Sequence, residues 1–178
     1  MQKKIENYAW VLPRPRRSNK YIGGFPQHFE KKLLRLLEID PEKHKILQPF
    51  GGMAEYGIRV DLNPETKPQV LADAHDLNMF EDEIFDLVIL DPPYNAEYNE
   101  RLYGFTKPLR WKQYTKEAVR VLKDGGWLVI YHMLSTPSIK DTVLTKRIFL
   151  ETRRWHKLRC IHIHRKNKQA WASQEQTT

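Results

Sequence analysis

The tetrapeptide Asp91-Pro92-Pro93-Tyr94 carries the residue types best suited to chemistry in this sequence. The carboxylate of Asp91 can accept one N–H of an amino group, and the carbonyl of Pro92 can accept the other. An amine held in this way keeps its lone pair directed at an electrophile. The two prolines fix φ and bring no N–H donors of their own, so the segment is stiff. The pattern therefore favours activation of a weakly nucleophilic amine.

The ring of Tyr94 adds a flat aromatic face beside this pair of acceptors. A nucleic-acid base can stack on such a face once it has left its duplex, because its reactive atoms are out of reach within a paired helix. The alternative interpretation is a Pro-Pro turn that closes a buried strand, with Asp91 as a cap and Tyr94 as packing. The apolar run 85–90 directly before the tetrapeptide favours a functional role, because it places Asp91 at a strand's carboxyl end.

Strand-like and helix-like segments alternate along the chain. The expected strands are residues 45–48, 57–61, 69–72, 85–90 and 127–131, with a closing pair at 147–152 and 158–164. The expected helices are residues 29–40, 111–122 and 137–144. This alternation predicts an α/β fold with a mainly parallel sheet, whose ligands lie beyond the carboxyl ends of the strands.

The tetrapeptide resembles the motif of the DPPY group of amino-methyltransferases, which use S-adenosyl-L-methionine. Other segments between about residues 21 and 132 match that group in the expected order. The segment Pro49-Phe50-Gly51-Gly52 is similar to its cofactor loop, where glycines let the backbone approach the ligand. Phe25, followed by Pro26, is similar to an element that covers the methionine end of the cofactor.

Two further acids match positions of the same group. Asp61 is similar to the carboxylate that binds the ribose hydroxyls of the cofactor. Asp73 resembles the position that faces the adenine amino group, with Ala74 or His75 as a backbone neighbour. The resemblance implies a Rossmann-like class I methyltransferase fold with an antiparallel closing strand pair. It also implies methylation of an exocyclic base amine, with adenine N6 in DNA as the first expectation.

The sequence departs from this group directly after the cofactor loop. Only residues 53–56 separate Gly52 from Gly57, and four residues cannot form the helix that normally follows. The site must then be completed by another segment, for which Lys20 or Arg17 is the expected source. The non-enzyme alternative is a nucleic-acid-binding protein whose cofactor pocket has decayed with that helix.

Length and hydropathy bound the domain organisation. A chain of 178 residues suits one domain with a sizeable core. We expect an extended basic N-terminal arm over residues 1–28, a methyltransferase domain over 29–168 and a disordered tail over 169–178. Prolines 13, 15 and 26 exclude a long helix or a central strand from the arm. No apolar run is long enough to cross a bilayer, so a cytoplasmic protein without a membrane partner is expected.

The charge of the chain favours a polyanionic partner. Thirty Lys and Arg against 22 Asp and Glu give a net charge of +8, which indicates nucleic acid, with DNA first and RNA second. The chain is too short for a separate target-recognition domain, so we expect modest sequence specificity. Candidate contacts, in which aromatic and cationic residues interleave, are Trp10, Arg14, Arg16, Arg17, Tyr98, Arg101, Tyr103 and Lys107.

Three alternatives concern substrate and metal. Among enzymes, an RNA base (adenine N6 or guanine N2) or cytosine N4 is the competing target, and Asp91 favours adenine because Ser often replaces it in cytosine enzymes.

Cys160, His162 and His164 alternate along an expected strand, with His156 nearby. One thiol among basic neighbours is a poor ligand set, so no metal site is expected.

Overall fold

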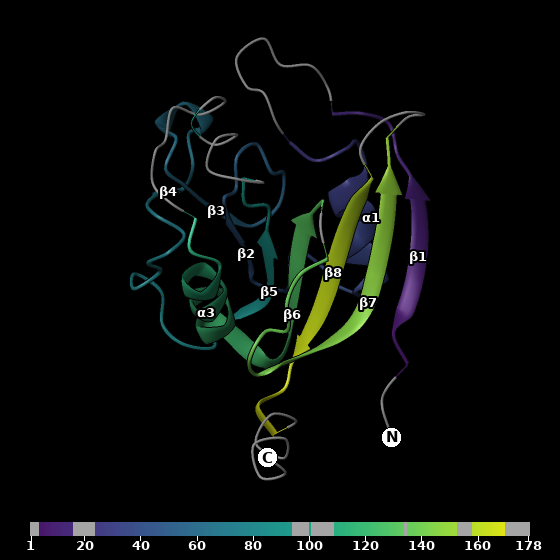
Figure 1. The fold of residues 1–178 in the computed structure, drawn as a ribbon. Helices are drawn as coiled ribbons and strands as arrows, with labels where there is room; N and C mark the ends of the chain where they lie inside the picture. Colours follow the sequence, from purple (N-terminus) through teal and green to yellow (C-terminus); the bar gives the residue numbers. More distant parts are fainter. Residues whose placement is uncertain are drawn as a thin grey trace.

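An eight-stranded sheet runs through the molecule in the order β1-β7-β8-β6-β5-β2-β3-β4 (Figure 1). The computed structural model describes residues 4–15, 24–93, 100, 109–133, 135–152 and 158–169. The strands are β1 (Glu6–Val11), β2 (Ile46–Pro49), β3 (Ile58–Asp61), β4 (Val70–Leu71), β5 (Phe85–Leu90), β6 (Leu122–His132), β7 (Thr142–Glu151) and β8 (Arg159–Lys166). The helices are α1 (Phe29–Leu36), the 3-10 turn η1 (Pro64–Thr66) and α3 (Trp111–Val121).

Strand direction gives the sheet one functional edge. Within the described residues β8 alone is antiparallel, pairing with β6 and β7, whereas all other neighbours pair in parallel. The carboxyl ends of seven strands therefore lie along the same side of the sheet, which is called its carboxyl edge below. Folds of the α/β class bind ligands on this side. The expected α/β fold, with a mainly parallel sheet and an antiparallel closing pair, is confirmed.

Helices α1 and α3 cover opposite faces of the sheet (Figure 1). In β5 the side chains alternate: Leu87 and Ile89 pack in the cluster that contains α1, and Val88 and Leu90 pack in the cluster that contains α3. A strand buried on both faces must be apolar throughout, which is why 85–90 is the clearest strand in the sequence. This double burial fixes the position of Asp91 at the strand's end.

The prediction of an arm over residues 1–28 is wrong for the stretch that forms β1. That strand pairs with β7 from Glu6↔Lys146 to Val11↔Glu151. Trp10 is buried at 6% exposure in the core beside α1, so it is not available as the expected nucleic-acid contact. The prolines that exclude a central strand are compatible with an edge strand, and β1 lies at the sheet's edge.

The prediction of a helix over 137–144 is also wrong. Asp141 has a φ of 60°, which interrupts any helix there, and β7 begins at Thr142. The Thr142 hydroxyl donates to the carbonyl of Ile139 at 2.9 Å, and this contact fixes the entry into the strand. Pairing along the whole of β8 outweighs the local helical spacing of the apolar residues.

The tail expected at 169–178 lies outside the described residues except for Gln169.

The connection between β2 and β3 is unusually short. Parallel neighbours normally need a crossover of a dozen or more residues, usually a helix, but residues 50–57 suffice here. Gly57 makes this possible: its φ is +77°, and a Cβ there would lie 2.5 Å from the Ile46 carbonyl oxygen. The expectation that no helix fits between Gly52 and Gly57 is confirmed.

In the described part of the chain, no helix has the length and apolar character to cross a membrane.

We predict that Gly57→Ala destabilises the protein by about 2–5 kcal/mol, because it adds left-handed backbone strain to a backbone clash. Gly125 is the matched control, since its φ is +71° but a Cβ there would only approach a guanidinium nitrogen of Arg165 at 4.0 Å. Gly125→Ala should therefore lose only about 1–2 kcal/mol, the strain alone. Urea unfolding measures both, and equal losses would contradict the role given to the Ile46 contact.

Candidate functional site

The carboxyl edge of the sheet gathers the acids that the sequence singled out. Asp61 ends β3, Asp73 follows β4 by two residues, and Asp91 directly follows β5. The loop from Phe50 begins at the end of β2, which lies between β3 and β5. The structure thus places all four at one edge, while Tyr94 lies outside the described residues.

The loop after β2 has a backbone that only its particular residues allow. Phe50 has a φ of 61° and Gly52 a φ of 44°. A Cβ on Gly51 would lie 2.7 Å from both the Gln48 carbonyl oxygen and the Arg59 Cβ. The Gly51 amide donates to the Val60 carbonyl at 3.0 Å, which holds the loop against β3. The glycine at this point is required by close backbone approach.

Asp61 is fixed to this loop by backbone donors. Its Oδ2 accepts the Gly52 amide at 2.8 Å, and its Oδ1 accepts the Asn63 amide at 2.8 Å. Each carboxylate oxygen has a second lone pair, so both can still accept a hydroxyl of a bound ligand. The geometry therefore provides an oriented carboxylate beside the glycine turn.

Glu30, in the first turn of α1, supports the short connection between β2 and β3. It is only 6% exposed; its Oε2 accepts the Glu55 amide at 2.9 Å, and its Oε1 accepts Gln48 Nε2 at 2.7 Å. Gln48 Nε2 also donates to the Tyr56 carbonyl at 2.7 Å. Burial raises the pKa of Glu30, and the donors from Glu55 and Gln48 oppose that rise. Both oxygens are therefore committed to the loop region.

The sequence interpretation missed Glu30, although a signal was present. Glu30 precedes Leu33, Leu34 and Leu37 at helical spacing, so it lies on the buried face of α1. A carboxylate on such a face needs donors, because an unpaired buried charge is costly. The Glu55 amide, in a connection that is too short to form a helix, is one of these donors.

Arg59 closes the loop from the other side. Its Nη1 donates to the carbonyls of Gly52 at 2.8 Å and Thr66 at 3.0 Å, and its Nη2 donates to Lys67 at 2.7 Å. A guanidinium with its fork of donors suits this task, because loop carbonyls need several partners at once. Lys20 and Arg17, the expected completing residues, lie outside the described part of the chain. Glu30, Gln48 and Arg59 provide the support that the structure does describe.

Asp73 is paired with His75. Its Oδ1 accepts the His75 amide at 3.0 Å and lies 2.6 Å from His75 Nδ1. His75 Nε2 in turn accepts the Arg110 amide at 3.0 Å. Ala74 between them is buried at 4% exposure, so its side chain fills the core and leaves the backbone for any ligand contact. The arrangement orients the Asp73 carboxylate through the imidazole ring.

Aromatic rings back this part of the site. The ring centroids of Phe50 and Tyr114 are 5.2 Å apart, and those of His75 and Tyr114 are 5.5 Å apart, in edge-to-face arrangements. Tyr114 is 4% exposed, and burial raises the pKa of its hydroxyl. The loop after β2, the segment after β4 and α3 are therefore packed against one another.

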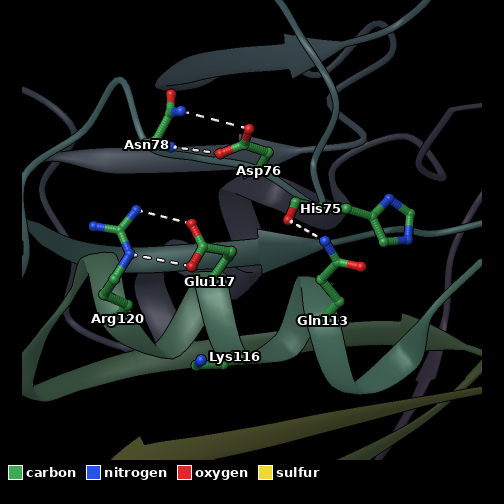
Figure 2. Close-up of a pocket in the computed structure, with 7 residues that line it drawn as sticks. All are labelled: His75, Asp76, Asn78, Gln113, Lys116, Glu117 and Arg120. Atoms are coloured by element: carbon green, nitrogen blue, oxygen red, sulfur yellow. Dashed lines mark hydrogen bonds and ion pairs between the residues drawn. The ribbon is translucent and has the colours of Figure 1, made fainter.

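A polar groove of about 470 Å³ continues from His75 along α3 (Figure 2). Its lining residues are His75, Asp76, Asn78, Gln113, Lys116, Glu117 and Arg120. Figure 2 shows Arg120 directed at Glu117, with an Nη2 to Oε2 distance of 2.9 Å, and Gln113 donating to the His75 carbonyl at 3.2 Å. The Arg120 guanidinium and the Glu117 carboxylate are thus engaged with each other.

Asp91 is the most perturbed acid at this edge. Burial raises the pKa of Asp91 to about 7, and the positive charge of Arg159 on β8 opposes the rise. Pro92 is buried and Pro93 half-buried. Asp91 itself is half-buried, and a carboxylate that is partly removed from water gains from additional N–H donors.

Phe25 covers the end of β6 beside Asp91. Its ring centroid lies 5.2 Å from that of Tyr131 and 4.9 Å from that of Phe29. Because Leu90 pairs with Ile130, Tyr131 is level with Asp91 on the neighbouring strand. Phe25 therefore packs beside the end of β6, and its expected contact with the methionine end of the cofactor stays a prediction.

The Cys160 and histidine stretch of β8 does not form a metal centre among the described residues, where no group of three suitable ligands occurs. Cys160 Sγ lies 3.6 Å from His162 Nε2, and His164 Nδ1 lies 3.0 Å from the Thr142 hydroxyl. Burial lowers the pKa of His162 and that of His164 to about 4. His156 and the proposed nucleic-acid contacts Arg16, Arg17, Tyr98, Arg101, Tyr103 and Lys107 lie outside the described ranges.

Comparison with known proteins rests on structure. No family model matches the sequence, and no curated protein matches it. The Haemophilus influenzae protein HI0767, described as a methylase, is 14% identical with a TM-score of 0.50, over 78% of this chain and 96% of that one. The Escherichia coli protein yhhF, described as a methyltransferase, is 13% identical with a TM-score of 0.50, over 88% and 92%.

A third similar structure is NodS, an N-methyltransferase from Bradyrhizobium japonicum. It is 13% identical with a TM-score of 0.51, and the match covers 79% of this chain and 98% of that one. At such identities the likeness concerns the arrangement of the backbone. The chain therefore has the Rossmann-like α/β fold of methyltransferases, with a mostly parallel sheet and an antiparallel strand pair.

Proposed function

We propose that this protein transfers a methyl group from S-adenosylmethionine to an exocyclic amine of a nucleic-acid base, with adenine N6 in DNA as the substrate. The observation that carries the proposal is Asp91, an under-solvated carboxylate followed by a rigid Pro-Pro pair, at the carboxyl end of β5. It lies on the same sheet edge as the glycine loop, Asp61 and Asp73. The methyltransferase fold supports this assignment.

The residues along the edge fit the cofactor. The glycine turn at Gly51 has no room for a Cβ because it packs against Gln48 and Arg59, and this close packing fixes the shape of the loop. Asp61 presents oriented oxygens for ribose hydroxyls, and Asp73 is the acceptor for the adenine amino group. When bound, the cofactor supplies a methyl group that its sulfonium charge has already activated. The task of the protein is therefore positioning.

Asp91 and Pro92 polarise the amine. The ionised carboxylate accepts one N–H and the Pro92 carbonyl accepts the other, which turns the nitrogen lone pair away from the ring and toward the methyl group. Arg159 favours the ionised form of Asp91 that this role needs. The prolines hold both acceptors still, and the proton lost from the methylated nitrogen passes to water.

Nucleic acid is the partner that the charge supports. A net charge of +8 favours binding to phosphates, and Tyr94 remains the predicted stacking surface for an extruded base. RNA bases and cytosine N4 present a similar amine, so the product decides between them.

We expect labelled S-adenosylmethionine, incubated with the protein and double-stranded DNA, single-stranded DNA or RNA, to label N6-methyladenine after digestion to nucleosides. Chromatography against standards identifies the product. N2-methylguanine, N4-methylcytosine or label confined to RNA would contradict the proposed substrate but keep a base methyltransferase. No label, together with nucleic-acid binding and no binding of S-adenosylhomocysteine, would leave a nucleic-acid-binding protein.

The rate should depend on the ionisation of Asp91. Only the carboxylate accepts an amine N–H through either oxygen, so kcat/KM should rise about tenfold per pH unit below pH 7 and level off above it. Asp91→Asn should lower kcat/KM by about 10²–10³ and abolish this pH dependence. A flat profile in the unmodified protein would contradict the role of Asp91.

Stability measurements separate this loss of function from misfolding. The folded protein holds the Asp91 proton more tightly than the unfolded chain, so Asp91 lowers stability as pH rises from about 4 to about 7. Asp91→Asn should therefore raise the free energy of unfolding by about 1–3 kcal/mol at pH 8, after solvent screening, and leave it unchanged at pH 4. Thermal melts at the two pH values check the sign.

Glu30 should control cofactor binding through the loop. Glu30→Ala leaves the Glu55 amide and Gln48 without their acceptor, so we expect a loss of about 2–4 kcal/mol in stability and about tenfold weaker S-adenosylhomocysteine binding by calorimetry. Glu30→Gln keeps one acceptor and should show a smaller loss of each. Glu42→Gln, on an exposed carboxylate, is the control. Unchanged affinity in a folded Glu30→Ala variant would show that the loop does not hold the cofactor.

A further inference from the structure

His75 contacts three parts of the molecule that the sequence keeps far apart. Its Nδ1 lies 2.6 Å from Asp73 Oδ1, and its Nε2 accepts the Arg110 amide at 3.0 Å. Its ring packs edge-to-face on Phe50 of the cofactor loop and on Tyr114 of α3, with centroid distances of 6.2 and 5.5 Å. A single side chain therefore joins the cofactor carboxylate to the start of α3.

The hydrogen bonds fix the protonation of this ring. The Arg110 backbone N–H can only donate, so Nε2 must present its lone pair. Nδ1 then carries the proton and donates to Asp73, and the ring is neutral. At 12% exposure its side chain has little freedom to turn without losing both partners. Displacement of the ring from this position would break both hydrogen bonds.

We propose that His75 is a positioning residue that couples occupancy of Asp73 by the cofactor to the placement of the first turn of α3. This inference rests on the proposed function, because it needs a ligand amine on Asp73. The start of α3 directly follows the segment that joins it to the tetrapeptide at 91–94. A ligand on Asp73 thereby favours the ordered start of α3 at Arg110.

Reciprocity gives the coupling its physical form. A ligand on Asp73 stabilises the carboxylate orientation that His75 holds, so it favours the position of the ring that makes both hydrogen bonds. In that position the ring accepts the Arg110 amide and so protects the beginning of α3. Because both contacts bias the position of one ring, an ordered α3 start must raise cofactor affinity by the same factor.

Two substitutions separate the contact of His75 with Asp73 from its contact with the Arg110 amide. His75→Asn places an amide N–H near the position of Nδ1, so it keeps the donor to Asp73 and loses the acceptor for Arg110. His75→Gln places an amide oxygen near the position of Nε2, so it keeps the acceptor and loses the donor. A variant that fails to fold is recognised by its melting curve, and the other variant then still tests one contact.

The experiment measures S-adenosylhomocysteine binding by calorimetry and amide hydrogen exchange over residues 110–114, with and without that ligand. In the unmodified protein we expect the ligand to slow exchange there about tenfold. His75→Asn should bind within about threefold of the unmodified protein but lose this slowing, whereas His75→Gln should bind about tenfold more weakly.

The outcomes distinguish the two proposals. No ligand binding by the unmodified protein would overturn the proposed function, and the coupling with it. Binding without slower exchange at 110–114 would overturn the coupling alone. Equal behaviour of the two variants in both measurements would also overturn it, because a merely structural histidine would affect affinity and protection together.

Discussion

The direct connection between β2 and β3 is the constraint on which the site depends. Residues 50–57 join two parallel neighbours without a helix, so their amides and carbonyls have no helical ladder to satisfy them. Glu30, Gln48, Arg59 and Asp61 supply the missing partners from flanking elements. The shape of the loop is therefore determined by side chains outside it.

A loop supported in this way differs from one that begins a helix. A helix N-terminus offers a dipole and a row of free amides, whereas here the Glu55 amide is already taken by Glu30 and the Gly52 amide by Asp61. Buried polar networks gain strength when every member is satisfied. The loop after β2 thus has fewer free amide donors than a helix N-terminus would have, and it is held in one shape by hydrogen bonds and by the contact of Phe50 with Tyr114.

Sequence reasoning succeeded where a local pattern decides the structure. The doubly buried run 85–90 and the helix beginning at Trp111 are found as expected, and the acids come to one edge because parallel strands must align their ends. It failed where distant pairing decides. The stretch 6–11 becomes a strand only because β7 offers an edge, and 142–144 joins β7 because β8 lies beside it. Glu30 and His75 were missed as supports because their partners lie far away in sequence.

The pairing of β1 with β7 has a consequence for how the chain reaches this state. Residues 6–11 are synthesised well before their partners, residues 146–151. This strand must wait, unpaired, until nearly all the rest of the sheet has left the ribosome. Closing so long a loop is entropically slow, and an unpaired strand with Trp10 awaiting burial can associate with other chains meanwhile. Pairing of β1 with β7 is thus a late step in the folding of this protein.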